Sequence, residues 1–271
     1  MQRYFPVQNR VSQPCMLAMA HSRGFEPESG YILNALKQVI MNALPKIPPL
    51  DWDLTNLSQW SVWGGVDEAG RGAWAGPVVA ASAVLTREIA EKWGNVLCQA
   101  RDSKTMKPEA RSALAMELKI ILPSWSVSEV DNQVIDKINI LEATKAAMRQ
   151  SVYGLKIQPD IVLIDGDHAP GSGLRERAVI DGDACSCAIA CASILAKTHR
   201  DALMIALDAD YPEYGFAKHK GYGTKEHQAA LAKLGPCPVH RLSYGPVRQQ
   251  ILSSEVIAKP PENDARQRDN S

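Results

Sequence analysis

The sequence lacks several features that would place it in a specialised class of protein. None of its apolar runs approaches the ~20 residues that cross a bilayer, so no membrane-spanning helix or membrane partner is expected. Its six cysteines follow no regular framework spacing, which argues against a disulfide scaffold and favours a reducing compartment. We therefore expect a cytoplasmic protein. No stretch of the chain repeats another.

The chain also has no surplus of charge of either sign. Its 30 lysines and arginines balance 30 aspartates and glutamates, so the net charge is zero. Nucleic-acid-binding proteins usually carry a basic surplus, so any basic surface here must be local. The 45% hydrophobic and 22% charged content is ordinary for a soluble globular protein. A length of 271 residues allows one large domain or two small ones.

The two ends of the chain differ in character from its middle. Residues 1–60 are predicted to be a partly disordered extension, with a helix over 31–44 that the following prolines end. Arg3, Arg10 and Arg23 precede the first acid, Glu26, which resembles a transit peptide weakly; we favour a plain extension. Residues 251–271, which end in the polar stretch KPPENDARQRDNS, are predicted to be a disordered tail.

Between these ends, residues 61–250 alternate between strand-like and helical patterns. Such alternation, with polar residues where strands end, predicts an α/β domain. The expected strands cover 62–68, 78–85, 124–130 and 160–166, and a further short apolar run covers 178–180. The expected helices cover 86–99, 108–122, 139–154, 188–208 and 225–234, and 215–223 is expected to be an irregular basic loop.

The most informative stretch is GVDEAGRGAWAGP at 65–77. Asp67 and Glu68 end an apolar strand, and a glycine–arginine–glycine turn follows at Gly70, Arg71 and Gly72. Neighbouring side chains on a strand point to opposite faces, so the two acids cannot both face a site directly. An acid pair at a strand end is typical of a divalent-cation site. The glycines let the backbone approach a ligand closely, and their NH groups can meet a phosphate.

Acidic residues end three separate apolar segments. Asp67 and Glu68 end one, Asp165 ends another, and Asp181 and Asp183 follow a third. One such acid alone would be a turn former or a helix cap. Several carboxylates together repel one another unless a cation is present, and carboxylate oxygens suit Mg²⁺ or Mn²⁺. Two such ions ~3.5–4 Å apart can support phosphodiester cleavage.

Taken together, the motifs resemble those of ribonuclease HII. Single motifs carry little information, but the ordered set is specific and covers most of 65–248. The matching stretches are GVDEAGRG at 65–72, DSK at 102–104, NILEAT at 139–144, IDG at 164–166, GDA at 182–184, ASILAKTHRD at 192–201, YPEYGFAKHKGYGT at 211–224 and HRLSYGP at 240–246.

The resemblance implies a ribonuclease H-like fold, with a mixed central sheet flanked by helices and a helical C-terminal part. It also implies an endoribonuclease that hydrolyses RNA in RNA/DNA hybrids and incises DNA on the 5′ side of an embedded ribonucleotide. Such an enzyme leaves a 3′-hydroxyl and a 5′-phosphate. We expect it to act as a monomer on hybrids and on DNA duplexes that contain ribonucleotides.

The resemblance further implies a site of four acids that hold Mn²⁺ or Mg²⁺. Asp183 is preferred to Asp181 because Gly182-Asp183 matches the GD of the family. Asp167 and Asp181 remain alternatives on sequence alone. The implied catalytic and metal-binding residues are Asp67, Glu68, Asp165 and Asp183.

The implied substrate-binding residues fall into two groups. The backbone of the Gly70-Arg71-Gly72 turn and the ring of Tyr222 would read the junction between ribose and deoxyribose. Candidate phosphate contacts are Lys104, Ser193, Lys197 and Arg200, the last three on one face of a helix; an ordinary solvated face is the alternative, most of all for Arg200.

Other interpretations remain open at this point. Cys187 and Cys191 have the i, i+4 spacing that could hold a soft metal, although packing is favoured, as it is for His199. The role of Cys185 is left open. Another nuclease with an acidic two-metal site, such as a DNA exonuclease, would not need the glycine turn with a tyrosine. An inert hybrid-binding protein would not need four acids, because acids beside phosphates weaken binding without metal.

Overall fold

The computed structural model describes residues 49–258 apart from 101, 102 and 104, and the side chains up to residue 252. Its centre is a five-stranded mixed sheet in the order β3-β2-β1-β4-β5. β1 pairs antiparallel with β2 and parallel with β4. β2–β3 is antiparallel and β4–β5 is parallel. The strands are β1 (Val62–Ala69), β2 (Val78–Thr86), β3 (Ser124–Val130), β4 (Ile161–Asp165) and β5 (Glu176–Val179).

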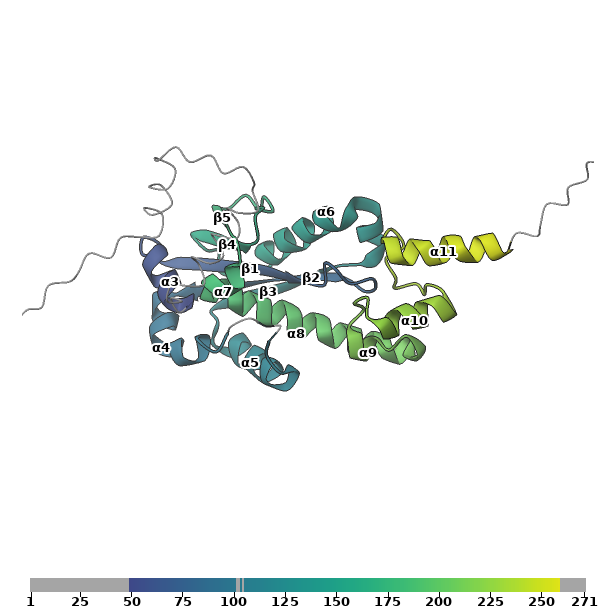
Figure 1. The fold of residues 1–271 in the computed structure, drawn as a ribbon. Coiled ribbons are helices and arrows are strands. Elements are labelled where there is room, and N and C mark those ends of the chain that lie inside the picture. The colour runs from purple at the N-terminus through teal and green to yellow at the C-terminus, as the bar shows by residue number, and fades with distance from the viewer. Residues whose placement is uncertain (1–48, 101–102, 104, 259–271) are drawn as a thin grey trace, which may run out of the picture. The chain divides into compact units, whose positions relative to one another are not determined.

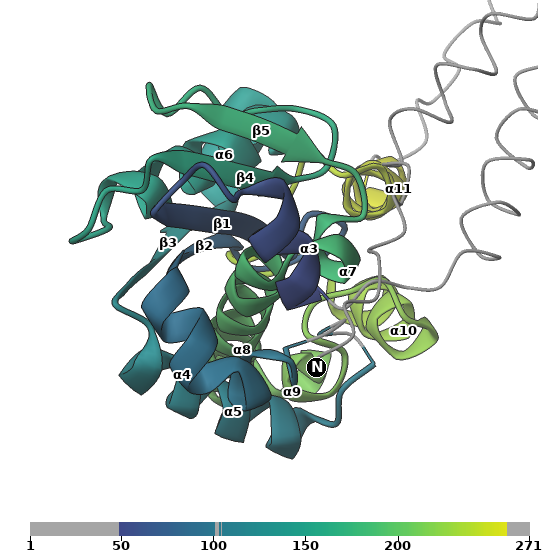
Figure 2. The same ribbon diagram turned by 90° about the vertical axis from the view of Figure 1, so that its left-hand side faces the viewer.

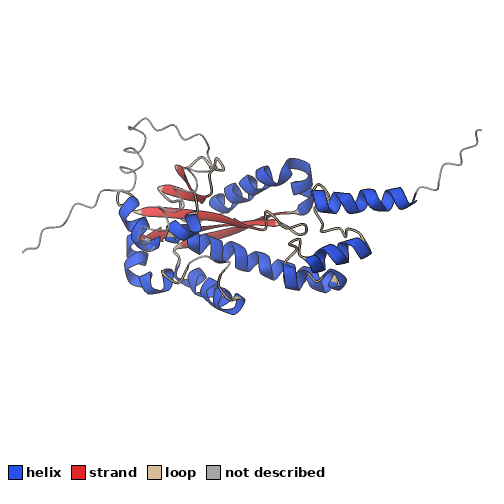
Figure 3. Cartoon of the chain, in the orientation of Figure 1, coloured by secondary structure: helices blue, strands red, loops and turns tan. Residues whose placement is uncertain are grey.

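Helices cover both faces of this sheet, as Figures 1 and 2 show. The helices are α3 (Pro49–Asn56), α4 (Arg87–Leu97), α5 (Pro108–Ile121), α6 (Asn132–Tyr153), α7 (Gly182–Cys185), α8 (Cys187–Asp210), α9 (Phe216–His219), α10 (Lys225–Leu234) and α11 (Gly245–Ala258), with a 3₁₀ turn over Pro212–Tyr214. Figure 3 shows the strands together in a central sheet with helices on both sides of it. All regular elements that follow β5 in the described part of the chain are helical. The predicted mixed sheet and helical C-terminal part are confirmed.

The apolar strands are buried on both sides because successive side chains alternate between two cores. Val79, Ala81 and Ala83 of β2 pack in the core that contains the start of α8. Ala80 packs in the core that contains α6. α8 lies against β1 so closely that a Cβ at Gly65 would lie 2.1 Å from the carbonyl carbon of Ala188. This contact brings the polar face of α8 next to the end of β1.

α6 begins at Asn132, about two helical turns before the predicted start at Asn139. Its first segment is capped by Asp131, whose Oδ1 accepts from Val134 N at 2.8 Å. The chain then kinks at Asn139 (φ 68°, ψ 165°). The side chain of Asn139 accepts from Leu141 N and Glu142 N at 3.0 and 3.1 Å, so its predicted capping role is confirmed for the second segment.

The described part of the chain corrects the predictions at both ends. Within the predicted extension, Pro49 starts α3, and Leu50 and Leu57 are buried in the core. The boundary of the tail at residue 250 is wrong, because α11 runs to Ala258, with Val247 and Ile251 at helical spacing. The loop over 215–223 contains the short helix α9. The predicted helix over 31–44 and residues 259–271 lie outside the described residues.

None of the helices within the described ranges is long and apolar enough to cross a membrane.

Candidate active site

The three parallel strands bring their carboxyl ends to one edge of the sheet. Val66 of β1 pairs with Ile164 of β4, so the next residues, Asp67 and Asp165, lie on neighbouring strands. Asp165 in turn pairs with Val179 of β5, the strand that leads to Asp181 and Asp183. Residues about a hundred positions apart therefore come together because of strand pairing.

Asp67 is the most buried of the predicted acids. Its side chain belongs to a residue that is only 5% exposed. Its Oδ1 accepts from Glu68 N at 2.6 Å, and Ser193 donates a side-chain hydrogen bond to its carboxyl group. Burial raises the pKa of Asp67 well above its usual range, and the charges of Glu68 and Asp165 raise it further. The carboxyl group therefore lies among like charges in a site shielded from water.

Asp165 and Asp183 meet at the start of α7. Gly182 N donates to Asp165 Oδ1 at 2.7 Å, and Asp183 is the next residue, in the first turn of that short helix. Burial and the nearby charges of Asp181, Asp183 and Asp165 raise the pKa of Cys185. The acids that follow β4 and β5 thus lie near the same thiol.

The two alternative acids occupy more open positions. Asp167 has a side chain that is 74% exposed and that bonds to His168 Nδ1 at 2.5 Å. Asp181 is exposed and has a left-handed backbone (φ 52°, ψ 42°) at the start of α7. Asp183 is half-buried, as Asp165 and Glu68 are.

The carboxylates do not form a complete set of metal ligands, and two of them accept hydrogen bonds from the backbone instead. In the described part of the chain, no three His, Cys, Asp or Glu side chains are arranged to hold a metal ion. Asp67 and Asp165 instead accept bonds from backbone NH groups. The all-oxygen donor set suits Mg²⁺ or Mn²⁺. A divalent cation would also offset the repulsion that raises the pKa of Asp67.

The glycine–arginine–glycine turn lies beside these acids. Arg71 has a half-exposed side chain whose Nη1 is 3.4 Å from Glu68 Oε1. Gly70 has a positive φ of 96°, which suits a residue without a side chain. By contrast, a Cβ added at Gly72 would have no atom within 4 Å, so its surroundings are open.

Tyr222 lies opposite the same turn, because its backbone pairs with the residue that follows Gly72. Ala73 and Tyr222 form an isolated β-bridge, and Trp74 N donates to Gly221 O at 2.8 Å. The half-buried ring of Tyr222 has two cations against it. Lys197 Nζ lies 5.6 Å and Arg200 Cζ lies 5.3 Å from the ring centroid.

The predicted phosphate contacts on α8 have three different surroundings. Ser193 is buried and shares a hydrogen bond of 2.9 Å with Ser103 Oγ, in addition to its bond to Asp67. Lys197 is half-buried and pairs with Asp201 at 2.7 Å. Arg200 is fully buried, so it is neither a phosphate contact on the surface nor part of a solvated face. Lys104 lies outside the described residues.

Sequence reasoning missed two residues that hold this site together. Arg241 Nη1 and Tyr244 Oη both donate to Arg71 O, at 2.9 and 2.5 Å. Both belong to the HRLSYGP motif, so their presence was visible in the sequence. Their role could not be predicted, because an arginine in a loop belongs to no periodic pattern that would indicate burial.

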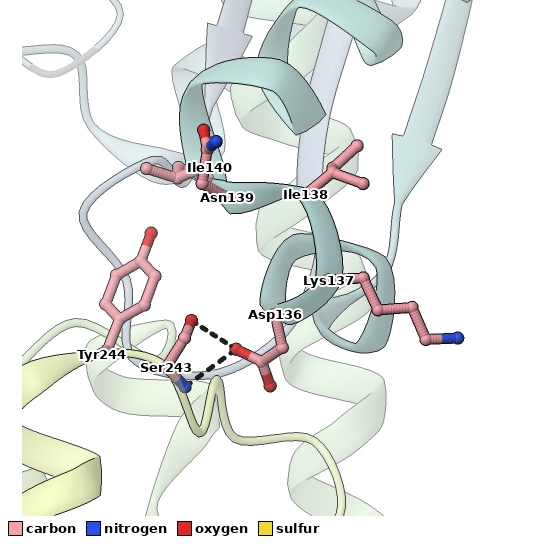
Figure 4. A pocket seen from close by; sticks show the side chains of 7 residues that line it. All are labelled: Asp136, Lys137, Ile138, Asn139, Ile140, Ser243 and Tyr244. Atoms are coloured by element: carbon pink, nitrogen blue, oxygen red, sulfur yellow. Dashed lines mark hydrogen bonds between the residues drawn. The ribbon is translucent and has the colours of Figure 1, made fainter.

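Tyr244 also lines a pocket of about 420 Å³ next to the turn. Figure 4 shows the ring of Tyr244 on one side of this pocket and the kink of α6, with Asn139 and Ile140, on the other. The Ser243 hydroxyl and NH donate to Asp136 Oδ1, at 2.6 and 2.9 Å, which joins the two walls (Figure 4).

Cys187, Cys191 and His199 lie outside this site. Cys187 and Cys191 are fully buried in the core, and the pKa of Cys187 is raised by its hydrogen bond to Cys191 and by burial. The structure therefore supports packing rather than a soft-metal site. His199 Nε2 lies 2.6 Å from Glu129 Oε1 on β3.

Known structures share this fold. The ribonuclease H2 of Pyrococcus horikoshii OT3 matches with a TM-score of 0.62 and 26% identity, over 72% of this chain and 99% of that chain. Bst-RNase HIII, solved in complex with Mn²⁺, matches with a TM-score of 0.60 and 17% identity, over 72% of this chain and 70% of that chain. The second likeness concerns the fold alone.

Sequence comparison agrees with the structural likeness. The ribonuclease HII of Caldicellulosiruptor bescii is 49% identical over 180 residues, which are 66% of this chain and 84% of that protein. The ribonuclease HII of Caulobacter vibrioides is 46% identical over 192 residues, which are 71% of this chain and 88% of that protein. The family model of ribonuclease HII matches residues 64–247. The resemblance is therefore confirmed, and this chain belongs to the ribonuclease HII family of endonucleases.

Proposed function

We propose that this protein hydrolyses RNA in RNA/DNA hybrids and incises DNA on the 5′ side of an embedded ribonucleotide. The observation that carries the proposal is the position of three sets of acids, from β1, β4 and α7, beside a glycine turn and a tyrosine. Family membership supports the reaction class, and the geometry supports the residues that perform it.

The acids supply the chemistry in this proposal. Asp67, Glu68, Asp165 and Asp183 would hold Mg²⁺ or Mn²⁺, and the Mn²⁺ found in Bst-RNase HIII supports a divalent ion. Bound there, such ions supply an activated water and stabilisation of the leaving oxygen. The chain itself orients the acids. Gly182 N and Glu68 N restrain the carboxyl groups of Asp165 and Asp67, and Ser193 restrains Asp67 from α8.

The turn and the tyrosine supply the choice of substrate. RNA and DNA differ at one nucleotide by the 2′-hydroxyl, which backbone groups can read if no side chain stands in the way. The open space at Gly72 suits this role, because neither packing nor a positive φ requires glycine there. Tyr222 is held by its backbone bridge to Ala73 and by the two cations against its ring, and this ring would lie against the next sugar.

Basic side chains near the site would provide local positive charge, although the net charge of the chain is zero. The ammonium of Lys197 and the half-exposed guanidinium of Arg71 lie at the two sides of the site and would contact phosphates. Lys104 would add a third cation. These contacts would set the position of the strand without reading its sequence.

The proposal extends to the working state of the protein. We propose that it acts as a monomer in the cytoplasm. The five described cysteines are free, which suits a reducing compartment.

The test is a cleavage assay on a DNA duplex that carries one ribonucleotide, with Mg²⁺ or Mn²⁺, followed by mapping of the cut. We expect a single cut on the 5′ side of the ribonucleotide with a 3′-hydroxyl end. Asp67→Asn should abolish the cut while folding and much of the hybrid binding persist. Normal turnover by that variant would remove Asp67 from the mechanism, and a cut in all-DNA duplex would favour the exonuclease or another nuclease.

A further inference from the structure

Two arginines are buried beneath the proposed substrate-reading turn. Arg200 on α8 and Arg241 in the loop before α11 are both fully buried. No ion pair among the described residues includes either of them. Burial lowers the pKa of Arg200 to about 10 and also lowers that of Arg241. A guanidinium stays protonated in proteins at neutral pH, so both side chains are charged. Buried charges without an acidic partner call for another source of stabilisation.

Backbone carbonyl groups supply that stabilisation. Arg200 donates from Nε to Pro77 O at 3.0 Å and from Nη2 to Ala75 O at 3.2 Å. Arg241 donates from Nε to Gly76 O at 3.0 Å and from Nη1 to Arg71 O at 2.9 Å. All four acceptors belong to the segment 70–77, which links β1 to β2.

This segment needs such donors because it lies outside the sheet ladder. Buried carbonyl groups must find partners, and a guanidinium offers five donors in one rigid plane. The contact is close. A Cβ at Gly70 would lie 1.9 Å from Arg200 Nε, so the turn rests directly on that guanidinium.

Arg200 also reaches the segment that carries the tyrosine. Its Nη1 donates to Lys220 O at 3.0 Å, and its guanidinium lies 5.3 Å from the centroid of the Tyr222 ring. One side chain therefore bonds the turn and the tyrosine loop together. Tyr244 reinforces Arg241: its hydroxyl accepts from Arg241 Nη1 at 2.9 Å and donates to Arg71 O at 2.5 Å.

We propose that Arg200 and Arg241 are positioning residues that fix the spacing between the Gly70–Gly72 turn and Tyr222. They would thereby determine the preference for a ribonucleotide followed by a deoxyribonucleotide. This inference rests on the proposed function, and it assigns neither arginine to a substrate contact.

Arg200→Lys and Arg241→Lys test the proposal because lysine keeps the charge but loses the planar set of donors. We expect the kcat/KM ratio between a duplex with one ribonucleotide and a continuous hybrid to fall by about tenfold or more. Hydrogen exchange should become faster at the amides of 70–76 and 220–222, with the sheet amides unchanged. A role through charge alone would leave both readouts as in the wild type and would overturn the proposal.

A milder variant removes the risk that a lysine variant does not fold. Tyr244→Phe deletes only the hydroxyl that bonds Arg71 O and Arg241, and it should shift the substrate ratio several-fold in the same direction. Tyr214→Phe is the matched control, since its hydroxyl donates to the carbonyl of Gly235 at 2.7 Å, away from the turn. Equal effects of the two variants, or equal losses on both substrates, would contradict the inference.

The proposed function and the proposed role of the two arginines can be refuted independently. If the wild type cuts neither substrate, the proposed function fails. Hydrogen exchange at 70–76 in the arginine variants still decides whether the guanidinium groups hold the turn.

Discussion

Two glycines of one turn are present for different physical reasons. At Gly70, a positive φ and the contact with Arg200 exclude a side chain, so glycine is needed for the structure. At Gly72, the backbone is ordinary and the surrounding space is open, so the fold does not require glycine. The open space is explained if a ligand occupies it.

Replacing each glycine by alanine should distinguish the structural requirement at Gly70 from the proposed ligand contact at Gly72. Gly72→Ala should leave the unfolding free energy within about 0.5 kcal/mol of the wild type, since no clash is created, and should raise KM for the ribonucleotide duplex at least tenfold. Gly70→Ala should destabilise the protein by about 1–3 kcal/mol through backbone strain and displacement of Arg200. Urea unfolding and steady-state kinetics measure both. A Gly72→Ala enzyme with wild-type kinetics would show that no substrate lies there.

Tyr222 offers a second test at the scale of one residue. Tyr222→Ala removes the ring but keeps the backbone bridge to Ala73. It should reduce incision at a single ribonucleotide at least tenfold more than cleavage of a continuous hybrid, because only the former presents a deoxyribose next to the scissile ribose. Parallel kinetics on the two substrates measure this. Equal losses would make Tyr222 structural.

At the scale of elements, α3 is attached to the catalytic part by a buried carboxyl group in addition to its apolar contacts. Asp53 Oδ2 accepts from Ala188 N at 3.0 Å, near the beginning of α8, and from Trp63 Nε1 at 3.3 Å. α3 lies before residue 64, where the family match begins. It nevertheless caps the helix that carries Ser193 and Lys197. Burial raises the pKa of Asp53 from 3.8 to about 7.

This shift predicts a pH dependence with a definite sign. Between about pH 4 and pH 7 the folded state holds a proton that the unfolded state has released, so stability falls as pH rises through this window. The full loss corresponds to about 4 kcal/mol, at about 1.4 kcal/mol per pKa unit. The facing thiol of Cys187 stays neutral there, because its own pKa is raised.

Asp53→Asn should remove this contribution. The difference in unfolding free energy between wild type and variant should fall from pH 4.5 to pH 7.5, since shared groups cancel in the difference; urea unfolding at each pH measures it. Asp160→Asn is the control, because that exposed carboxylate also accepts two backbone hydrogen bonds, from Ser61 N and Val62 N. A constant difference across the range would contradict a buried, protonated Asp53.

At the scale of the whole molecule, the acids join elements that are distant along the chain. The proposed site draws its acids from β1, β4 and α7, and the charges of Glu68 and Asp165 repel that of Asp67, which opposes folding. A ligand that binds only the folded cluster stabilises the entire domain by mass action.

Mn²⁺ or Mg²⁺ should therefore raise the unfolding free energy, by about 2.7 kcal/mol at one hundred times its Kd. Asp165→Asn should reduce this gain strongly. Asp167→Asn should leave it intact, because Asp167 is exposed and bonded to His168. Thermal or urea unfolding with metal and with a chelator measures the gain. Equal losses in the two variants, or no gain in the wild type, would refute the four-acid assignment.

Much of the fold could be predicted from the sequence because its signals are local. Apolar runs and helical spacing identify strands and helices, and the cap at Asn139 follows from its neighbours Leu141 and Glu142. The start of α6 at Asn132 was missed since its first segment has no strong apolar period. α11 was not predicted as a helix, and it crosses the predicted boundary between domain and tail at residue 250.

The sequence by itself determined the family and which acids end strands, because the motif order and the strand pattern are properties of the chain alone. Only the tertiary structure decided that Arg200 lies beneath the turn rather than in solvent, that Arg241 holds Arg71, and that Asp53 caps α8. These contacts join residues 123, 170 and 135 positions apart. A buried charge is stable only where the folded chain supplies its partners, and no local pattern records where those partners will be.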